Sequence, residues 1–360
     1  MARVIPDYWR DTATKKTIRA WELDPHSLDR IRREIAGLLP RSVRLTYGYR
    51  SDTRVSAELS MTGVLQRGSW VRLTLDTEDA NGKKYPRQEL GTFVISRSTH
   101  DDLTDITTLT LQSVIWSISE DRLSSRWTVG KGTSAKKAIQ RACKVCQRQA
   151  VFLPSYRDRA YGKTVAFLPS EAAFSGFLFD ACKVANARMD VDGHGRLTFA
   201  GYAEPRRRAA DWVLDERERR SIILVKGRTS EDNSGEAYNR TLVQHTKTSG
   251  KSEQYIFGSY NQPATSPISG SARGFTRTKV HEESDLKPET TAQANRRARA
   301  YSGEDANCHI ERKVTVLWCD INAGDVVDYI TAAGKHEKRL VKTVEARLDT
   351  WTKELTMEVA

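Results

Sequence analysis

Polar and apolar residues alternate in four segments between Arg50 and Asp121. The segments are residues 55–61, 71–76, 91–96 and 106–112. A period of two places one face of a strand in a core and the other in water, so each segment is expected to be a strand. Asn81-Gly82 lies between the second and third segments and suits a tight reversal. Short strands at this spacing predict a small antiparallel barrel or sandwich.

The C-terminal part of the chain repeats this pattern. Apolar residues again alternate with polar ones in residues 314–318, 324–330, 340–348 and 355–359. Gly324-Asp325 supplies a turn that delivers the second of these segments. The chain is therefore expected to contain two β units of similar construction.

A helical period replaces the alternation between these units. Ser134 can cap a helix through Ala150 whose apolar residues fall on one face. A second helix is expected over residues 170–187, and a hairpin with a Gly-rich turn over residues 188–199. Helix, strand, helix and hairpin together predict a compact α/β insertion between the β units.

Two further segments are interpreted from caps and composition. Residues 1–24 show no sustained period and are expected to form an arm, after which Asp24-Pro25 has the chemistry of a helix start. Four apolar residues follow at helical spacing before Pro40, namely Leu28, Ile31, Ile35 and Leu38. Residues 247–288 are rich in Ser, Gly, Thr and Pro, which predicts a long loop that is functional or ordered by a partner.

These patterns predict a mainly β (α+β) fold, with two similar small β-barrel or sandwich domains and an inserted α/β domain. The expected divisions are an N-terminal arm and short helix over residues 1–40, and a first barrel over 41–125 completed by about 204–235. The insertion covers 126–203, and the second barrel covers 236–360 with the loop 247–288 inside it.

The composition is that of a folded chain. Hydrophobic residues make up 38% and charged residues 29% of the 360 positions. The sequence has no run of about eighteen apolar residues and no signal peptide at its N-terminus, so we expect no spanning helix and synthesis in the cytoplasm. The five cysteines are scattered, which predicts buried thiols in a reducing compartment.

Positive charge is concentrated in the predicted insertion. The chain has a net charge of +12, and residues 126–203 contain thirteen Lys and Arg against five Asp and Glu. Four of these cations fall on the polar side of the first predicted helix, namely Lys137, Arg141, Lys144 and Arg148. This face is either an ordinary solvated surface or a contact for an acidic partner or nucleic-acid phosphates. No aromatic residues are interleaved with it, which disfavours single-strand binding.

No segment nominates a catalytic, cofactor-binding or metal site. Cys143 and Cys146 have the spacing of a redox or zinc pair, but they fall in mid-helix on the apolar face without a second such pair. Asp190 and Asp192 precede a Gly-rich turn that lacks the ligand spacing of a calcium loop. The sequence contains no nucleophile elbow, phosphate loop or dinucleotide fingerprint. We therefore expect no enzymatic activity.

The succession of segments resembles the hub proteins of phage tail tips and baseplates. The resemblance rests on residues 89–95 followed by 109–114, on residues 239–243 followed by 266–269, and on an Ala-rich helix followed by residues 320–327 and a final strand pair. It covers roughly residues 40–360. It implies a homotrimer in which two similar barrels per chain form a pseudo-sixfold ring, in a short form without an enzymatic extension.

The resemblance also implies the partners. They are a tail-tube hexamer or distal tail protein, the C-terminus of the tape-measure protein, and a fibre or spike protein. The expected function is thus that of a structural virion protein at the tail tip, made in the host cytoplasm and without membrane contact. Two alternatives remain open, a basic DNA-binding protein and, with less support, a wall-active tail enzyme. Specific nucleic-acid binding is not expected.

Overall fold

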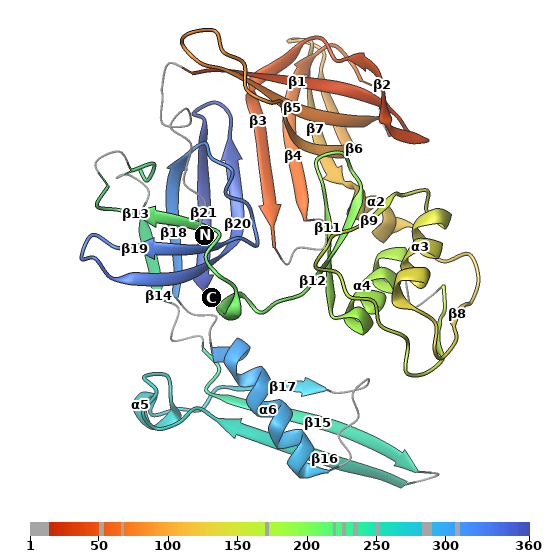
Figure 1. The fold of residues 1–360 in the computed structure, drawn as a ribbon, viewed down its shortest axis with the longest axis vertical. Coiled ribbons are helices and arrows are strands. Elements are labelled where there is room, and N and C mark those ends of the chain that lie inside the picture. Colours follow the sequence, from red (N-terminus) through yellow and green to blue (C-terminus); the bar gives the residue numbers. More distant parts are fainter. Residues whose placement is uncertain are drawn as a thin grey trace.

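The computed structural model describes residues 14–49, 54–65, 68–169, 173–218, 221–224, 228–232, 237–249, 252–282, 290–306 and 310–360. Within these ranges the chain is mainly β, as the alternating segments predict. Figure 1 shows two β barrels side by side, an α/β insertion beside the first barrel, and a smaller unit with a long helix below them. In the same ranges no helix is long and apolar enough to cross a membrane.

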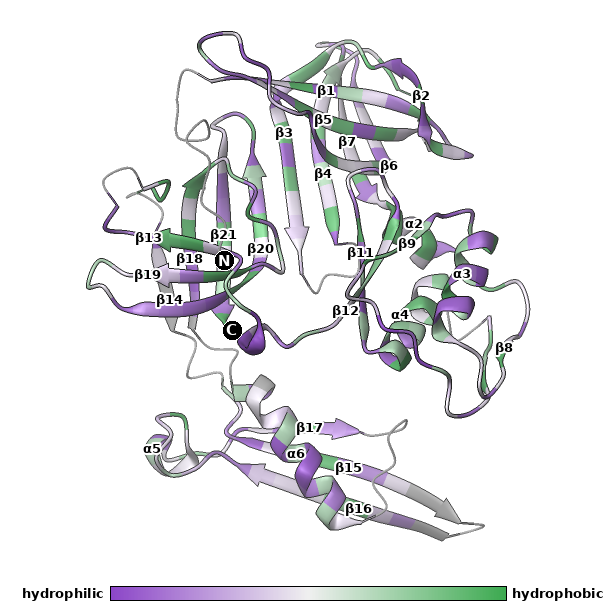
Figure 2. Ribbon diagram, viewed as in Figure 1, coloured by the Kyte–Doolittle hydropathy of each residue, from purple (hydrophilic) through white to green (hydrophobic). Residues whose placement is uncertain are grey.

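The first barrel wraps the N-terminal strands around a core. Its strands are β1 (Lys15–Asp24), β2 (Ser27–Glu34), β3 (Leu38–Gly48), β4 (Val55–Thr62), β5 (Trp70–Glu78), β6 (Gln88–Asp101) and β7 (Ile106–Ser113). They are ordered β3-β4-β7-β6-β5-β1-β2 and pair antiparallel. Leu45, Leu73 and Leu111 are fully buried in the core, and hydrophilic residues alternate with hydrophobic ones along these strands (Figure 2).

The second barrel repeats this order. Its strands are β13 (Trp212–Asp215), β14 (Thr229–Asp232), β18 (Ile310–Leu317), β19 (Val326–Ile330), β20 (His336–Arg347) and β21 (Thr352–Val359). The order β14-β18-β21-β20-β19-β13 matches β3-β4-β7-β6-β5-β1 strand for strand. One pairing differs in direction, because β13 runs parallel to β19 whereas β1 runs antiparallel to β5. The predicted similarity of the two β units is confirmed at the level of their topology.

The insertion lies between β7 and β13. It contains α2 (Val114–Glu120), β8 (Trp127–Val129), α3 (Ala135–Val145), β9 (Ala150–Phe152), β10 (Val165–Phe167), α4 (Phe174–Ala185), β11 (Ala187–Val191), β12 (Leu197–Gly201) and the 3-10 turn η1 (Pro205–Arg207). Ser134 accepts a hydrogen bond from the Lys137 amide and caps α3, as its sequence predicts. Both predicted helices and the β11–β12 hairpin are present, although the expected helix start at Ser170 lies outside the described residues.

The segment between β14 and β18 forms a unit of its own, which we call the appended unit. It consists of β15 (Arg240–Ser249), β16 (Ser252–Asn261), α5 (Gly270–Arg273), β17 (Thr278–Glu282) and α6 (Thr291–Ala306). The sheet order is β16-β15-β17, and α6 packs on one face. Its small core contains Val243, Ile256, Ala294 and Ala298.

The predicted arm and short helix over residues 1–40 are wrong where the structure describes them. Residues 15–34 form the β1–β2 hairpin of the first barrel, and β1 pairs with β5 along Lys15–Leu23. The Asp24 carboxylate accepts the His26 amide at 3.0 Å and shapes a tight turn instead of capping a helix. The helical spacing was a coincidence, because Ile31 is 46% exposed while Ile35 is buried. Residues 1–13 lie outside the described ranges.

The predicted long loop over residues 247–288 is also wrong. Its first part continues β15 and forms β16, and a later part forms β17, so eighteen of its 42 residues are paired in a sheet. The Ser and Gly content masked a period of two, in which Ile256 faces α6 while Tyr255 and Phe257 face away from it. The second barrel consequently does not coincide with residues 236–360, since the appended unit interrupts it between β14 and β18. The prediction that residues 204–235 complete the first barrel is wrong as well, because β13 and β14 pair with β19 and β18 of the second barrel.

Candidate assembly surfaces

The two barrels are joined by direct strand pairing. The end of β20 pairs antiparallel with β3, from Thr343 opposite Gly48 to Arg347 opposite Arg44. Tyr49 N donates to Lys342 O at 2.9 Å, and Leu348 N donates to Val43 O at 3.3 Å, so these bonds extend the ladder at both ends. A single hydrophobic core runs through both barrels. The barrels are therefore held as one body rather than tethered by a linker.

The same irregularity appears in β6 and in β20. The β6–β7 register shifts between Ile95 and Arg97, and the β20–β21 register shifts between Val341 and Thr343. At the start of each bulge the amide turns to the opposite neighbour: Ile95 N donates to Ser69 O at 3.1 Å, and Val341 N donates to Asp325 O at 2.9 Å. A β-bulge bends its strand and redirects the residues beyond it. The two barrels thus share a β-bulge at an equivalent position as well as a strand order.

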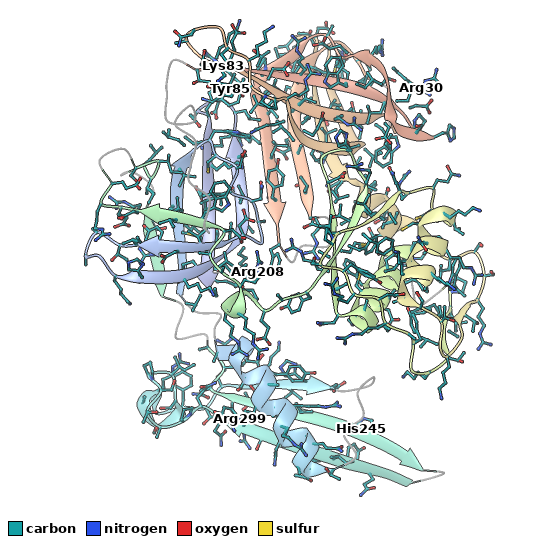
Figure 3. The ribbon with its side chains drawn as sticks, viewed as in Figure 1. Arg30, Lys83, Tyr85, Arg208, His245 and Arg299 are labelled. Atoms are coloured by element: carbon teal, nitrogen blue, oxygen red, sulfur yellow. The ribbon has the colours of Figure 1, made fainter. Side chains whose placement is uncertain are left out.

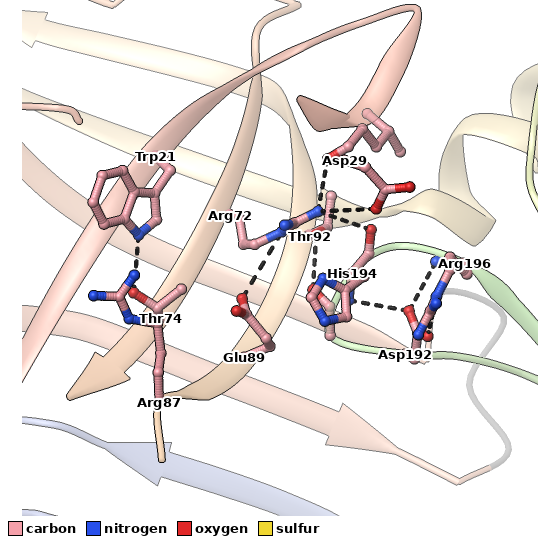
Figure 4. A network of polar contacts seen from close by, with 12 residues as sticks. Trp21, Asp29, Arg72, Thr74, Arg87, Glu89, Thr92, Asp192, His194 and Arg196 are labelled. Atoms are coloured by element: carbon pink, nitrogen blue, oxygen red, sulfur yellow. Dashed lines mark hydrogen bonds and ion pairs between the residues drawn. The ribbon is translucent and has the colours of Figure 1, made fainter. Parts of the chain in front are cut away.

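A buried arginine fixes the insertion against the first barrel. Arg72 of β5 is 5% exposed, and its guanidinium donates to Leu28 O at 2.6 Å, His194 O at 3.2 Å and Thr92 Oγ1 at 3.2 Å. Thr92 Oγ1 donates in turn to Gly193 O at 2.8 Å. Figure 4 shows this network between the barrel strands and the β11–β12 turn. The charge and its three hydrogen bonds tie the β1–β2 hairpin, the barrel wall and the insertion together.

The β11–β12 turn also makes a close backbone approach. A Cβ on Gly193 would lie 2.4 Å from the Glu89 Cβ, and one on Gly195 would lie 2.9 Å from Thr92. Gly195 also has φ +82°, a region that favours glycine. Asp192 accepts Arg196 Nε at 2.7 Å across the turn. The Gly-rich sequence predicted as a hairpin is therefore a docking turn, which no sequence signal distinguished from an exposed one.

A polar cavity of about 600 Å³ opens where both barrels meet the insertion. Its walls include Tyr47, Glu89, Arg188, Asp190, Asp320 and Asn322. Lys353 is buried at one side with its ammonium 4.9 Å from the Trp318 ring centroid, and it donates to Ile321 O at 3.0 Å. Burial lowers the pKa of Lys353. Asp325, another wall residue, has its pKa raised by burial and accepts Trp212 Nε1 at 3.0 Å.

The four cations predicted to form a partner-contact face on α3 do not share one environment. Lys137, Arg141 and Lys144 are exposed. Arg141 stacks on the Trp127 ring at 4.4 Å, and Arg148 lies 4.7 Å from the Trp70 ring centroid, half-buried at the join to the first barrel. Burial lowers the pKa of the Arg148 guanidinium. Arg148 therefore helps to dock the insertion, while the role of the other three in partner contact stays a prediction.

The cysteines of the insertion lie in its core. Cys143 and Cys146 occupy the buried face of α3, as predicted, and Cys182 of α4 is buried beside them. Burial raises the pKa of Cys146 to about 11 and that of Cys182 to about 12. Thiols held neutral in this way are weak nucleophiles and poor metal ligands. The described residues contain no group of three or more side chains placed to hold a metal ion.

The appended unit carries a polar network on one face and aromatic residues on the other. Thr241 Oγ1 donates to Asp305 at 2.7 Å, and His281 Nε2 lies 3.0 Å from the same carboxylate while its ring stacks on Tyr301. On the opposite face Tyr255 and Phe257 stack at 6.1 Å and are 51% and 46% exposed. Three arginines, Arg30 of β2, Arg208 and Arg299 of α6, lie in separate parts of the molecule (Figure 3).

Three solved structures with this architecture are tail proteins. The tail protein from Neisseria meningitidis MC58 has a TM-score of 0.66 over 95% of this chain and 96% of that chain, at 11% identity. The 43 kDa tail protein of prophage MuSo2 from Shewanella oneidensis gives 0.61 over 95% and 98%, also at 11% identity. Prophage tail protein gp18 from Listeria monocytogenes EGD-e gives 0.57 over 95% and 94%, again at 11% identity. The chain has the fold of phage tail proteins.

This tail-protein fold confirms the resemblance drawn from the order of the sequence segments. The likeness extends along almost the whole chain, so it includes the insertion and the appended unit as well as the barrels. No protein-family model matches the sequence, and no curated protein matches it. At such low identity the fold is what the structures share, and the residues that make contacts must be found in this chain itself.

Proposed function

We propose that this protein is a structural component of a phage virion, the hub of a tail tip or baseplate. The observation that carries the proposal is the repetition of one barrel within the chain, with matching strand order and matching bulges in β6 and β20. Two equivalent barrels per chain let three chains present six similar units. A homotrimer of this kind matches a sixfold partner while keeping one polypeptide.

The proposed ring closes the tail tube and connects it to the structures beyond. Its sixfold face would contact a tail-tube hexamer or a distal tail protein, and its other contacts would be the tape-measure C-terminus and a fibre or spike protein. We place the protein at the tail tip of the virion, after synthesis in the host cytoplasm. The direct β3–β20 pairing supports this role, because a ring that bears load needs barrels that cannot rotate independently.

We propose that the protein acts without catalysis. Burial keeps the Cys146 thiol neutral, and the carboxylates of Asp192 and Asp215 pair with Arg196 and Arg217, so these groups have structural roles. DNA binding is not favoured, because the cations of α3 are divided between exposed side chains and the buried Arg148 join.

Imaging and mass measurement test the proposal together. Negative-stain images of the purified protein should show a threefold ring with a near-sixfold outline, and light scattering should give the mass of a trimer. Compact monomers at high protein concentration, combined with tight and salt-dependent binding of duplex DNA, would overturn the hub and favour the DNA-binding alternative. Hydrolysis of peptidoglycan by the purified chain would overturn the proposal that the protein is not an enzyme.

A further inference from the structure

β6 and β20 are equivalent strands, but only β20 uses its outer edge. After its bulge β20 keeps β21 on one side and takes β3 on the other, over Thr343–Arg347. After the equivalent bulge β6 keeps β7 on one side, from Arg97 to Asp101. No described residue pairs with the other side of this part of β6, and Arg97, Thr99 and His100 are exposed there. The edge is a template for another strand.

The strand that should complete it can be identified by the same equivalence. β3 in the first barrel corresponds to β14 in the second, because each pairs with the strand that flanks β7 or β21. β14 ends the sheet in the described part of the chain, so its outer edge also has no strand on it. The β20–β3 contact within a chain therefore has a counterpart, β6 with β14, that the described part of the chain does not form. Repeating the rotation that relates the two barrels of one chain would bring β6 to β14 of another chain.

We propose that β6 of one chain pairs antiparallel with β14 of the next copy, which makes the contact between chains a repeat of the contact within the chain. The register is set by the pairings of the equivalent strands. Glu345 opposite Thr46 becomes Thr99 opposite Glu231, and Arg347 opposite Arg44 becomes Asp101 opposite Thr229. Such an interface is head-to-tail, and it closes into a ring when every step repeats the same rotation.

The backbone directions support this register. Within the chain, Lys342 O and Leu348 N bond to the β3 side, so alternate residues of β20 between them direct their amides and carbonyls to β3. The corresponding residues of β6 are Ser96, Ser98 and His100. By this equivalence their main-chain groups are expected to point away from β7, toward the space where β14 of the neighbour would lie.

The two junctions differ in polarity. Within the chain Ala346 of β20 lies opposite Leu45 of β3, and both are buried, as is Val344 of β20. At the equivalent positions the junction between chains has Ser98, His100 and Ser230. An apolar junction suits barrels that fold together, and a polar one suits chains that must stay apart in water until they assemble. The ring contact is therefore expected to depend on protein concentration.

Cysteine cross-linking tests the register. Thr99 and Glu231 form a non-hydrogen-bonded pair, in which Cα atoms lie about 4.5 Å apart, within disulfide range. We expect T99C/E231C to give covalent trimers on oxidation, well above wild-type background. Separate T99C and E231C chains should cross-link only when mixed, as a head-to-tail contact requires. T46C/E345C is the matched control that should form its disulfide within one chain, and D101C/E231C is two residues out of register and should fail.

A second variant keeps the test independent of disulfide chemistry. Ser98→Pro removes one outward amide while leaving the β6–β7 bonds, so the trimer should dissociate with the melting temperature retained. This inference rests on the proposed hub function for ring closure, and the two fail differently. Trimers that form without the Thr99–Glu231 cross-link and survive Ser98→Pro overturn the strand pairing but leave the hub. Monomers at every concentration, with no cross-link, overturn both.

Discussion

Replacing Arg72 with methionine should undock the insertion from the first barrel. Methionine keeps much of the length and apolar stem of the side chain but removes the donors to Leu28 O, His194 O and Thr92 Oγ1. It also removes the cation 3.9 Å from Glu89, whose Oε2 is buried with no hydrogen-bond partner in the described residues. The substitution therefore leaves one carboxylate and two carbonyls, all partly buried, without the donors that they have in the wild type.

The expected cost can be worked from those losses. Hydrogen bonds to a charged group contribute about 1.5–3 kcal/mol each to stability. Removing one partner of a buried ion pair costs about 3–5 kcal/mol. The two contributions come from the same guanidinium and overlap, so they are not added. We expect Arg72→Met to lower the free energy of unfolding by about 3–5 kcal/mol. Residues 191–197 should lose amide protection first, since the β11–β12 turn is held by His194 and Gly193.

Urea unfolding with hydrogen exchange measures both effects. Arg196→Met is the matched control in the same hairpin, where the pair with Asp192 is 38% and 24% exposed and is expected to contribute below about 1 kcal/mol. If Arg72→Met unfolds within about 1 kcal/mol of the wild type and residues 191–197 stay protected, the network does not hold the insertion and the reasoning fails.

Three further outcomes are expected. Reversing the charge of Lys137 and Lys144, which are exposed, should block tail assembly in a plaque assay without changing the melting temperature, whereas Arg148→Glu should lower that temperature because Arg148 stacks on Trp70; normal tails from the double variant would refute partner contact. Gly258→Ala should destabilise the appended unit by about 1–3 kcal/mol, because the new Cβ would lie 2.1 Å from the Ala294 carbonyl carbon of α6, and unchanged exchange in α6 would contradict this. Burial raises the pKa of Glu216, but hydrogen bonds from Tyr329, the Ala332 amide and Arg228 outweigh it and leave that pKa below its ordinary value of 4.5. Its stabilising contribution is thus complete above pH 4.5 and is lost as the pH falls through the lower folded value, so Glu216→Gln should flatten the acid side of the stability profile, and an unaltered profile would count against it.

The sequence predicted the barrel strands because their burial is one-sided. Leu59, Leu109 and Leu111 are buried, whereas their neighbours in the sequence are exposed or partly buried, so the alternation is visible locally. The two helices of the insertion could be predicted in the same way, because apolar residues recur at helical spacing around Ile139 and around Phe177. These elements follow local patterns that the final fold only reinforces.

The sequence predictions that were wrong failed for a different reason. β2 is exposed along most of its length, so its apolar residues carried no period of two, and their chance spacing imitated a helix. β16 alternates from Tyr255 to Gly258, but glycine stands where a large residue would have marked the buried face, because α6 passes too close for a side chain. Arg72 looked like the polar member of an alternating strand, and only the docking of the distant turn at His194 makes it buried. Contacts across more than a hundred positions leave no local signal.

The positions of the two insertions in the chain decide what kind of adaptor the proposed ring would be. In the first barrel residues 49–54 join β3 to β4 directly, whereas in the second the whole appended unit separates the equivalent β14 and β18. Every second barrel around the ring would therefore carry an appended unit, and the barrels between would not. The barrels themselves would repeat every sixth of a turn around the ring, whereas the appended units would repeat every third of a turn. A single polypeptide would in this way convert the symmetry of a tube into that of a trimeric spike.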